Sequence, residues 1–516
     1  MDQESRTFGP VEAPPFRLAR LVPWLLVLGI ALLFAATCWR AYSELPNTYD
    51  EYDILHPASD FLKGVDLPLG KYPPFSFLFY ALFLFLFHGV GIDMLAVGRV
   101  VNLGLLLLNL FLFYRVSLSY LGRNWALMSV FLFASTPLVV FSGVFVKTEG
   151  LLISETLALM LCLNWMYEGK ATVWTTIFSG VLCAVGMTTK YALMLPVMYV
   201  LATVYLYMVK KKEKRIFFHY SLFALIFIIM IVTIWPNFVE YILSWRKVNS
   251  SDPYFISSPS VLMAVDELWA FPYGRYSYAF CLLIPFSVGP LVYVLGLLSF
   301  GRWKSLPVVP VLAFVSFFLC FLIVVNLTLL RVFWIYTLLS PMVVLLAVMR
   351  LKFLFCSDSI LKKRLSILLI TMMLILTPSK AMSIIDFVHT FSALQIPIKI
   401  DNYSGKAIKT MAIIYNESSI ANGINPDDPA GDFLKINPDI AIVSDTYLLN
   451  FCKYRRNPIY QKQCEFFHRL ISGGYEYEVV TLLRDRNKYS GLFPGKDLSP
   501  TIYLVYKKGE ELHFSP

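Results

Sequence analysis

The sequence predicts an α-helical protein that crosses a membrane many times. Of its 516 residues, 58% are hydrophobic and only 15% are charged. A typical soluble protein carries about 25% charged residues. Apolar runs long enough to span a bilayer recur along the chain, and short basic clusters separate them. The net charge of +10 therefore reflects membrane topology and does not indicate a nucleic-acid partner.

The apolar runs define the expected membrane helices. No small-residue cleavage site follows the first run, so we expect a retained helix rather than a signal peptide. The expected spans cover residues 21–39, 96–116, 125–146, 150–167, 171–189, 191–209, 216–235, 276–300, 306–330, 332–349 and 365–385.

Residues 72–92 are also long enough to span, and the distribution of basic residues decides against it. If this segment does not cross, the basic clusters all fall on one side, which the positive-inside rule assigns to the cytoplasm. These clusters are Arg17/Arg20, Arg115/Arg123, the KKKEKR stretch at 210–215, Arg302/Lys304 and Arg350–Arg364. We therefore expect about eleven crossings, with 72–92 a re-entrant or interfacial helix on the outer face. Pro73 and Pro74 suit the first turn of such a helix.

This topology places the N-terminus in the cytoplasm and gathers charged residues from distant segments on the outer face. The predicted membrane interior is nearly free of charge, with Glu155 the main exception. A transport path would instead place paired polar residues at mid-membrane. The pattern favours a chemical site at the outer surface over a transporter.

The first substantial polar stretch, residues 47–76, follows the first apolar run. It contains the adjacent acids Asp50 and Glu51 and the bases Lys63 and Lys71. Acidic side chains at a membrane face are unfavourable unless they bind something or face water. The alternative interpretation is an ordinary hydrated loop.

From residue 386 the hydropathy drops, and the tail is long enough for a small domain. We expect a transmembrane domain over 1–385 and an extracytoplasmic α/β domain over 386–516. Strands are predicted at 440–444, 475–483 and 501–506, and a helix around 460–471. Of the eight cysteines, Cys452 and Cys464 share a polar segment of this tail. An oxidising compartment would pair them in a disulfide.

Several motifs occur in an order that resembles the GT-C membrane glycosyltransferases. They are the acidic pair after the first helix, FLKG at 61–64, KYPP at 71–74, SGVLCAVGMTTKYALMLPV at 179–197, TIWPNF at 233–238 and LLRVFWIYTLLSPMVVLLA at 329–347. The pattern is most similar to family 39, which includes protein O-mannosyltransferases and the aminoarabinose transferase of lipid A. The family's Arg-Tyr pair is replaced here by Arg331-Val332. The second outer-face acid of the family is matched by either Glu149 or Glu155.

The resemblance implies an enzyme that transfers a sugar from a polyprenyl-phosphate carrier to an acceptor hydroxyl, with inversion. Such a reaction needs a general base on the acceptor and cations around the leaving phosphate. Asp50 fits the base, and Glu51 would orient the acceptor or share the role of the base. Lys71, Lys190 and Arg331 would bind the donor phosphate, although each could instead be an interfacial anchor. Glu149 or Glu155 would position the acceptor.

The remaining expectations concern partners and rivals. The expected partners are membrane lipids, the lipid-linked donor and an acceptor that is a glycan, a lipid or a protein. The expected location of the protein is a bacterial plasma membrane. No metal site and no further cofactor are assigned, although the acidic pair is compatible with binding of a divalent metal ion. The alternatives are an oligosaccharide ligase or polymerase of the same architecture, and a lipid-linked transporter or flippase.

Overall fold

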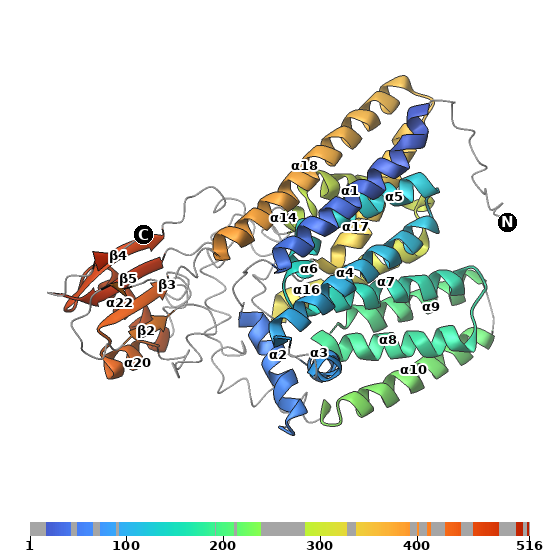
Figure 1. Cartoon of the computed structure of the whole chain (residues 1–516). Coiled ribbons are helices and arrows are strands. Elements are labelled where there is room, and N and C mark those ends of the chain that lie inside the picture. The colour runs from blue at the N-terminus through green and yellow to red at the C-terminus, as the bar shows by residue number, and fades with distance from the viewer. Residues whose placement is uncertain are drawn as a thin grey trace.

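Figure 1 shows the computed structural model of the chain. It describes residues 17–42, 49–65, 73–88, 92–190, 192–210, 214–238, 284–327, 337–392, 400–401, 410–413, 429–444, 458–483, 502–508 and 513–514.

The described part of the first 392 residues is helical. Its helices are α1 (Arg17–Tyr42), α2 (Tyr49–Leu62), α3 (Pro74–Phe87), α4 (Met94–Leu118), α5 (Arg123–Ala134), α6 (Pro137–Val144), α7 (Thr148–Tyr167), α8 (Val173–Lys190), α9 (Met194–Lys210), α10 (Lys214–Ile234), α14 (Ile284–Val288), α15 (Pro290–Ser299), the 3-10 helix η3 (Phe300–Ser305), α16 (Val308–Leu327), α17 (Ser340–Phe355) and α18 (Ile360–Ser392). Each expected span overlaps at least one of these helices.

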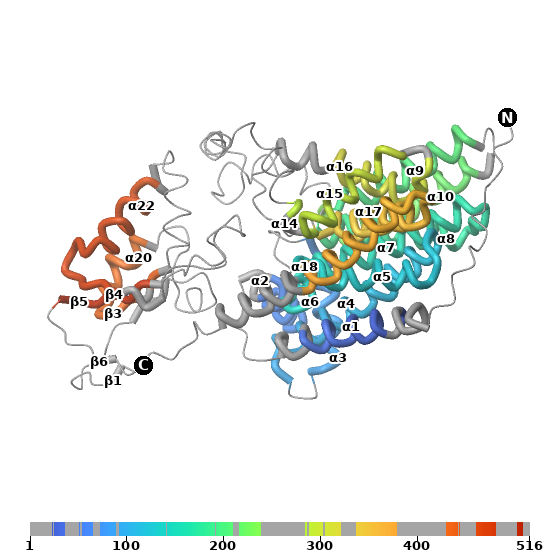
Figure 2. Tube along the Cα trace, turned by 90° about the horizontal axis from the view of Figure 1, so that it is seen from above, coloured from blue at the N-terminus to red at the C-terminus, as the bar shows by residue number. Residues whose placement is uncertain are grey.

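The long helices pack side by side around one large apolar core (Figures 1 and 2). Within the described ranges, four helices are long and apolar enough to cross a membrane, at Met94–Leu118, Thr148–Tyr167, Ile216–Ile234 and Thr337–Phe355. The pair α5 and α6 adds a fifth if it counts as one span. The chain is thus a helical multi-span membrane protein, and the total of about eleven crossings stays a prediction.

Two expected spans are each broken into two helices. The segment 125–146 bends by 68° between α5 and α6. Pro137 begins α6, and a proline disfavours helical backbone in the residue before it. The described part of 276–300 breaks at Gly289, whose φ of 93° suits glycine, and Pro290 then starts α15. Hydropathy detects both segments but not the breaks.

Helices α2 and α3 lie across the end of the bundle that faces the C-terminal tail, and α3 is seen end-on in Figure 1. Helix α3 has 14 residues and is therefore about 21 Å long, less than the ~30 Å of a bilayer core. Its length fits the predicted interfacial or re-entrant helix. Helix α9 ends and α10 begins at the opposite end of the bundle, where the basic cluster 210–215 was expected.

The tail contains a small sheet covered by helices. Strands β2 (Thr410–Ile413), β3 (Ile440–Ser444), β4 (Tyr477–Leu483) and β5 (Ile502–Lys507) pair in the order β2-β3-β5-β4. The β2-β3 pair is parallel and the other two are antiparallel. A separate pair joins β1 (Ile400–Asp401) to β6 (His513–Phe514). The predicted strands and the helix 460–471 are all close to observed elements.

The tail has an apolar core of its own. Helices α20 (Pro429–Ile436) and α22 (Pro458–Ile471) bring Phe433 and Phe467 onto the sheet residues Ala441 and Val505. Helix α22 ends before Gly473, which has a φ of 77° and so favours glycine. The tail thus has a core separate from that of the helical bundle, while helix α18 continues past residue 386 to Ser392. The domain boundary between residues 385 and 386 stays a prediction.

Candidate functional site

The acidic pair of the sequence begins helix α2. Asp50 and Glu51 lie in its first turn, where the helix dipole favours negative charge. The backbone of Asp50 is described and its side chain is not. Glu51 is fully buried, and its helix packs on α3 and α4 through Ile54, Leu55 and Ala58. The hydrated-loop interpretation of this stretch is therefore wrong for Glu51.

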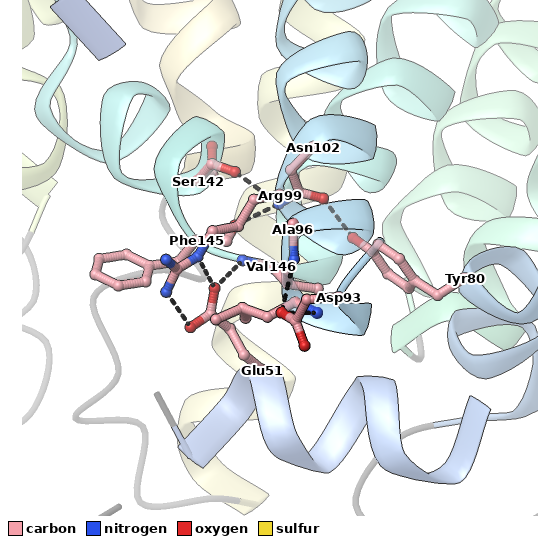
Figure 3. Close-up of polar contacts among 10 residues, drawn as sticks. Glu51, Tyr80, Asp93, Ala96, Arg99, Asn102, Ser142, Phe145 and Val146 are labelled. Carbon is pink, nitrogen blue, oxygen red and sulfur yellow. Dashed lines mark hydrogen bonds and ion pairs between the residues drawn. The ribbon is translucent and has the colours of Figure 1, made fainter. Parts of the chain in front are cut away.

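A buried ion pair fixes the position of Glu51 (Figure 3). Arg99 of α4 donates from Nε to Oε1 and from Nη2 to Oε2 of Glu51, both at 3.1 Å. The backbone N–H of Val146 also donates to Oε1, at 3.0 Å. A fork-on-fork arginine–carboxylate pair is directional and charge-assisted. Glu51 thus joins three segments: α2, α4 and the connection that leads into α7.

Arg99 is a site residue that the sequence interpretation missed. It lies within the expected span 96–116, and its side chain is buried. A charged residue inside an apolar segment is a recognised sign of a functional or structural site. The sequence carries this sign, because Arg99 is a charged residue within the apolar run 96–116. Gly98 beside it permits the close packing, because a Cβ there would lie 2.8 Å from a methyl group of Val146.

A polar stripe on α4 continues from Arg99 into the bundle. Asn102 is one turn further on, and its Nδ2 donates to the carbonyl oxygens of Ser142, at 3.0 Å, and Phe145 (Figure 3). The hydroxyl of Tyr80, on α3, donates to Oδ1 of Asn102. Residues three apart share a helix face, so Asn102 directly, and Arg99 through Glu51, hold the connection before α7.

Asn109, two turns beyond Asn102, holds the start of α7. Its Nδ2 donates to the carbonyl oxygen of Gly150 at 2.8 Å, and its Oδ1 accepts from Ser154 at 2.7 Å. Together with Asn102 this fixes both the connection before α7 and its first turns. These turns carry one of the two candidate acceptor-positioning acids, Glu149.

Glu149 and Lys190 form the second ion pair of the site. Lys190, in the last turn of α8, binds Oε1 of Glu149 in the first turn of α7. The Glu149 side chain is 2% exposed and that of Lys190 is 24% exposed. The other carboxylate oxygen of Glu149, Oε2, is buried without a hydrogen-bond partner. Leaving a buried acceptor unpaired is unfavourable by about 1–3 kcal/mol.

Glu155 lies deeper in the bundle and has different surroundings. Its Oε1 accepts a hydrogen bond from Thr189 at 3.1 Å, and its Oε2 has no partner. Gly186 makes room for it, because a Cβ there would lie 3.0 Å from Oε2. The two glutamates thus contact consecutive residues of α8, and of the two only Glu149 contacts a base.

The other predicted residues fall outside the part of the chain that the structure describes. These are Lys71, Arg331 and Cys452. Cys464, the second member of the predicted disulfide, is disulfide-bonded. Among the described residues, no group of three or more His, Cys, Asp or Glu side chains is placed to hold a metal ion.

Comparison with known proteins finds one family profile that matches part of the chain, and solved structures with a similar fold. Residues 71–236 match the sequence profile of the dolichyl-phosphate-mannose-protein mannosyltransferase family. This range includes Arg99, Glu149 and Lys190. The match confirms the predicted resemblance and the predicted class, a membrane glycosyltransferase. A search of curated proteins finds no match.

Two solved structures share the fold at low sequence identity. The ArnT protein of Cupriavidus metallidurans, in its apo state, is 12% identical with a TM-score of 0.51, and the alignment covers 94% of this chain and 98% of that one. An oligosaccharyltransferase of Archaeoglobus fulgidus, in complex with Zn and sulfate, is 12% identical with a TM-score of 0.50, covering 87% and 71%. These similarities concern the fold alone.

Proposed function

We infer that this chain, a membrane glycosyltransferase of the GT-C type, transfers a sugar from a polyprenyl-phosphate donor to an acceptor hydroxyl at the outer membrane face. One observation carries the proposal. The first turn of α2, the first turn of α7 and the last turn of α8 converge at one end of the bundle. The turn that carries the acidic pair is thus linked to a segment with a further acid and its basic partner, which supports an assignment of this chemistry to that end of the bundle.

In the proposed reaction, Asp50 is the general base. It accepts the proton of the acceptor hydroxyl, and the acceptor oxygen attacks the anomeric carbon from the face opposite the phosphate. The bond between that carbon and the phosphate oxygen breaks, and the polyprenyl phosphate leaves with the electron pair. A single displacement of this kind inverts the anomeric configuration. Base catalysis contributes about 100- to 10,000-fold to such steps.

Glu51 has a supporting role in this scheme. Both of its carboxylate oxygens accept hydrogen bonds from Arg99, so the carboxylate is engaged within the protein and the base is assigned to Asp50. Its bonds to Arg99 and Val146 anchor the first turn of α2, and therefore the backbone of Asp50, beside the start of α7.

Cations would stabilise the charge that develops on the leaving phosphate. Lys190 contacts Glu149 and is the first such cation. We assign the same role to Lys71 and Arg331, because the predicted topology locates them on the same face. Glu149 is the better candidate for positioning the acceptor, since it lies in the first turn of α7 and contacts Lys190. Glu155 is given a packing role between α7 and α8.

The donor class can be tested with the purified protein in lipid nanodiscs. Radiolabelled polyprenyl-phosphate hexoses and pentoses are supplied with a membrane extract as acceptor, and nucleotide sugars serve as the comparison. We expect release of polyprenyl phosphate and labelling of an acceptor from the lipid-linked donors only. Transfer of a preassembled lipid-linked oligosaccharide would favour a ligase or polymerase. In proteoliposomes, movement of the intact lipid-linked sugar across the bilayer without cleavage would favour a flippase.

A further inference from the structure

The ion pair between Glu149 and Lys190 contains two residues that the proposed function uses for different substrates. Lys190 would bind the donor phosphate, and Glu149 would position the acceptor. In the structure they bind each other. Neither side chain can serve its substrate fully while this pair is closed.

The surroundings of the pair indicate which partner moves. Glu149 is buried in the first turn of α7, and the backbone on both sides of it is held by hydrogen bonds from Asn102 and Asn109. The helix dipole stabilises its negative charge at that position even without a partner. Lys190 is more exposed, ends its helix and has a long flexible stem. The ammonium can therefore leave while the carboxylate stays.

We propose that the donor phosphate competes with Glu149 for the Lys190 ammonium, so that donor binding opens the pair and frees Glu149 to accept the acceptor hydroxyl. A phosphate offers several charged oxygens to the ammonium, whereas only one oxygen of Glu149 contacts it. Once Lys190 has turned to the phosphate, both oxygens of Glu149 need a hydrogen-bond donor. Its Oε2 already lacks one, and the acceptor hydroxyl supplies it. The pair thereby makes binding ordered, donor first. This inference rests on the proposed function.

The test measures equilibrium binding of undecaprenyl phosphate to the full chain in nanodiscs. Glu149→Gln removes the competitor with little change in volume, and we expect it to tighten binding about tenfold. Lys190→Gln should weaken binding about tenfold. The double variant should bind undecaprenyl phosphate no more tightly than Lys190→Gln alone, because the ammonium for which Glu149 and the phosphate compete is absent.

Glu155→Gln is the matched control. It neutralises another buried carboxylate of α7 that contacts the residue next to Lys190 but not Lys190 itself. Its affinity for the lipid phosphate should equal that of the wild type. An equal gain in both variants would mean a general charge effect and would overturn the competition. Should Glu149→Gln fail to fold, Glu149→Asp, with its shorter reach, is expected to tighten binding to a smaller degree.

The outcomes separate this inference from the function on which it rests. If Lys190→Gln weakens binding but neither change at Glu149 tightens it, Glu149 supports Lys190 instead of competing with it, and ordered binding is wrong. If Lys190→Gln has no effect, Lys190 does not bind the phosphate and this inference is wrong. A wild-type protein that does not bind the lipid phosphate at all would contradict the proposed donor itself.

Discussion

The carboxylate of Glu51 and the guanidinium of Arg99 form a buried, two-bonded ion pair between α2 and α4. The two residues are 48 positions apart in the sequence. Their pair decides where the acidic turn of α2 lies relative to the rest of the site.

Arg99→Met should destabilise the protein strongly, because it leaves the charge of Glu51 buried without its partner. Removing one member of a buried pair lowers the free energy of unfolding by about 3–5 kcal/mol. Thermal unfolding of the detergent-solubilised protein measures the loss. The double variant with Glu51→Gln should recover part of it. The exposed pair Asp60–Lys63 at the C-terminal end of the same helix is the control, where Lys63→Met should change stability by about 0–1 kcal/mol. A loss as small as that for Arg99→Met would contradict a structural role for the buried pair.

Asp50→Asn should abolish sugar transfer while the protein stays folded and inserted in the membrane. The change removes the base but hardly alters volume, and we expect the rate to fall about 100- to 10,000-fold. Donor turnover in nanodiscs gives the rate. Asp60→Asn, an exposed acid of the same helix, should retain near wild-type activity. If Asp50→Asn slows transfer only a few-fold, another group is the base.

Arg331→Ala should weaken binding of the donor lipid far more than it changes the KM for the acceptor, because the proposal places this guanidinium on the donor phosphate. Binding of a polyprenyl phosphate reports the first quantity and steady-state kinetics the second. Arg302 is a control of the same residue type from the predicted cytoplasmic face, where it stacks 3.6 Å above the ring of Phe353. Unchanged donor affinity in Arg331→Ala would exclude phosphate recognition by this residue.

The predicted topology can be checked by labelling cysteines with a membrane-impermeant reagent on intact cells. Ser257→Cys and Ser404→Cys should react, since both lie in segments expected outside. Lys212→Cys, in the basic cluster between α9 and α10, should not react. The native Cys356, whose side chain is exposed between α17 and α18, should also not react, because the predicted topology puts it on the cytoplasmic side. Labelling at position 212 from outside would mean that residues 72–92 cross the membrane after all.

Cys452 and Cys464 should form a disulfide when the protein is expressed in an oxidising host. Cys464 is already disulfide-bonded in the structure, and Cys452 is the neighbouring cysteine of the tail. In the chain-entropy model, a short loop of this kind stabilises the tail by roughly 3 kcal/mol. Non-reducing mass spectrometry of peptides identifies the pair. Two free thiols would contradict the bond and weaken the predicted outside location of the tail.

The sequence by itself determined where helices form and which segments are apolar. Every expected span overlaps a helix, and α3 begins at the two prolines as predicted. The tail strands at 440–444 and 502–507 also lie where the chain is rich in β-branched or aromatic residues. These features depend on hydropathy, backbone propensity and proline, which act over a few neighbouring residues.

Only the tertiary structure decided which charged groups meet. It paired Glu51 with Arg99, a residue that lies within an apolar run of the sequence. It also distinguished Glu149, which binds Lys190, from Glu155, which binds Thr189. It also set the mixed strand order of the tail sheet. Each of these outcomes depends on how helices and strands pack against partners far away in the chain. No local pattern specifies that packing, because the same apolar run can bury any of its faces.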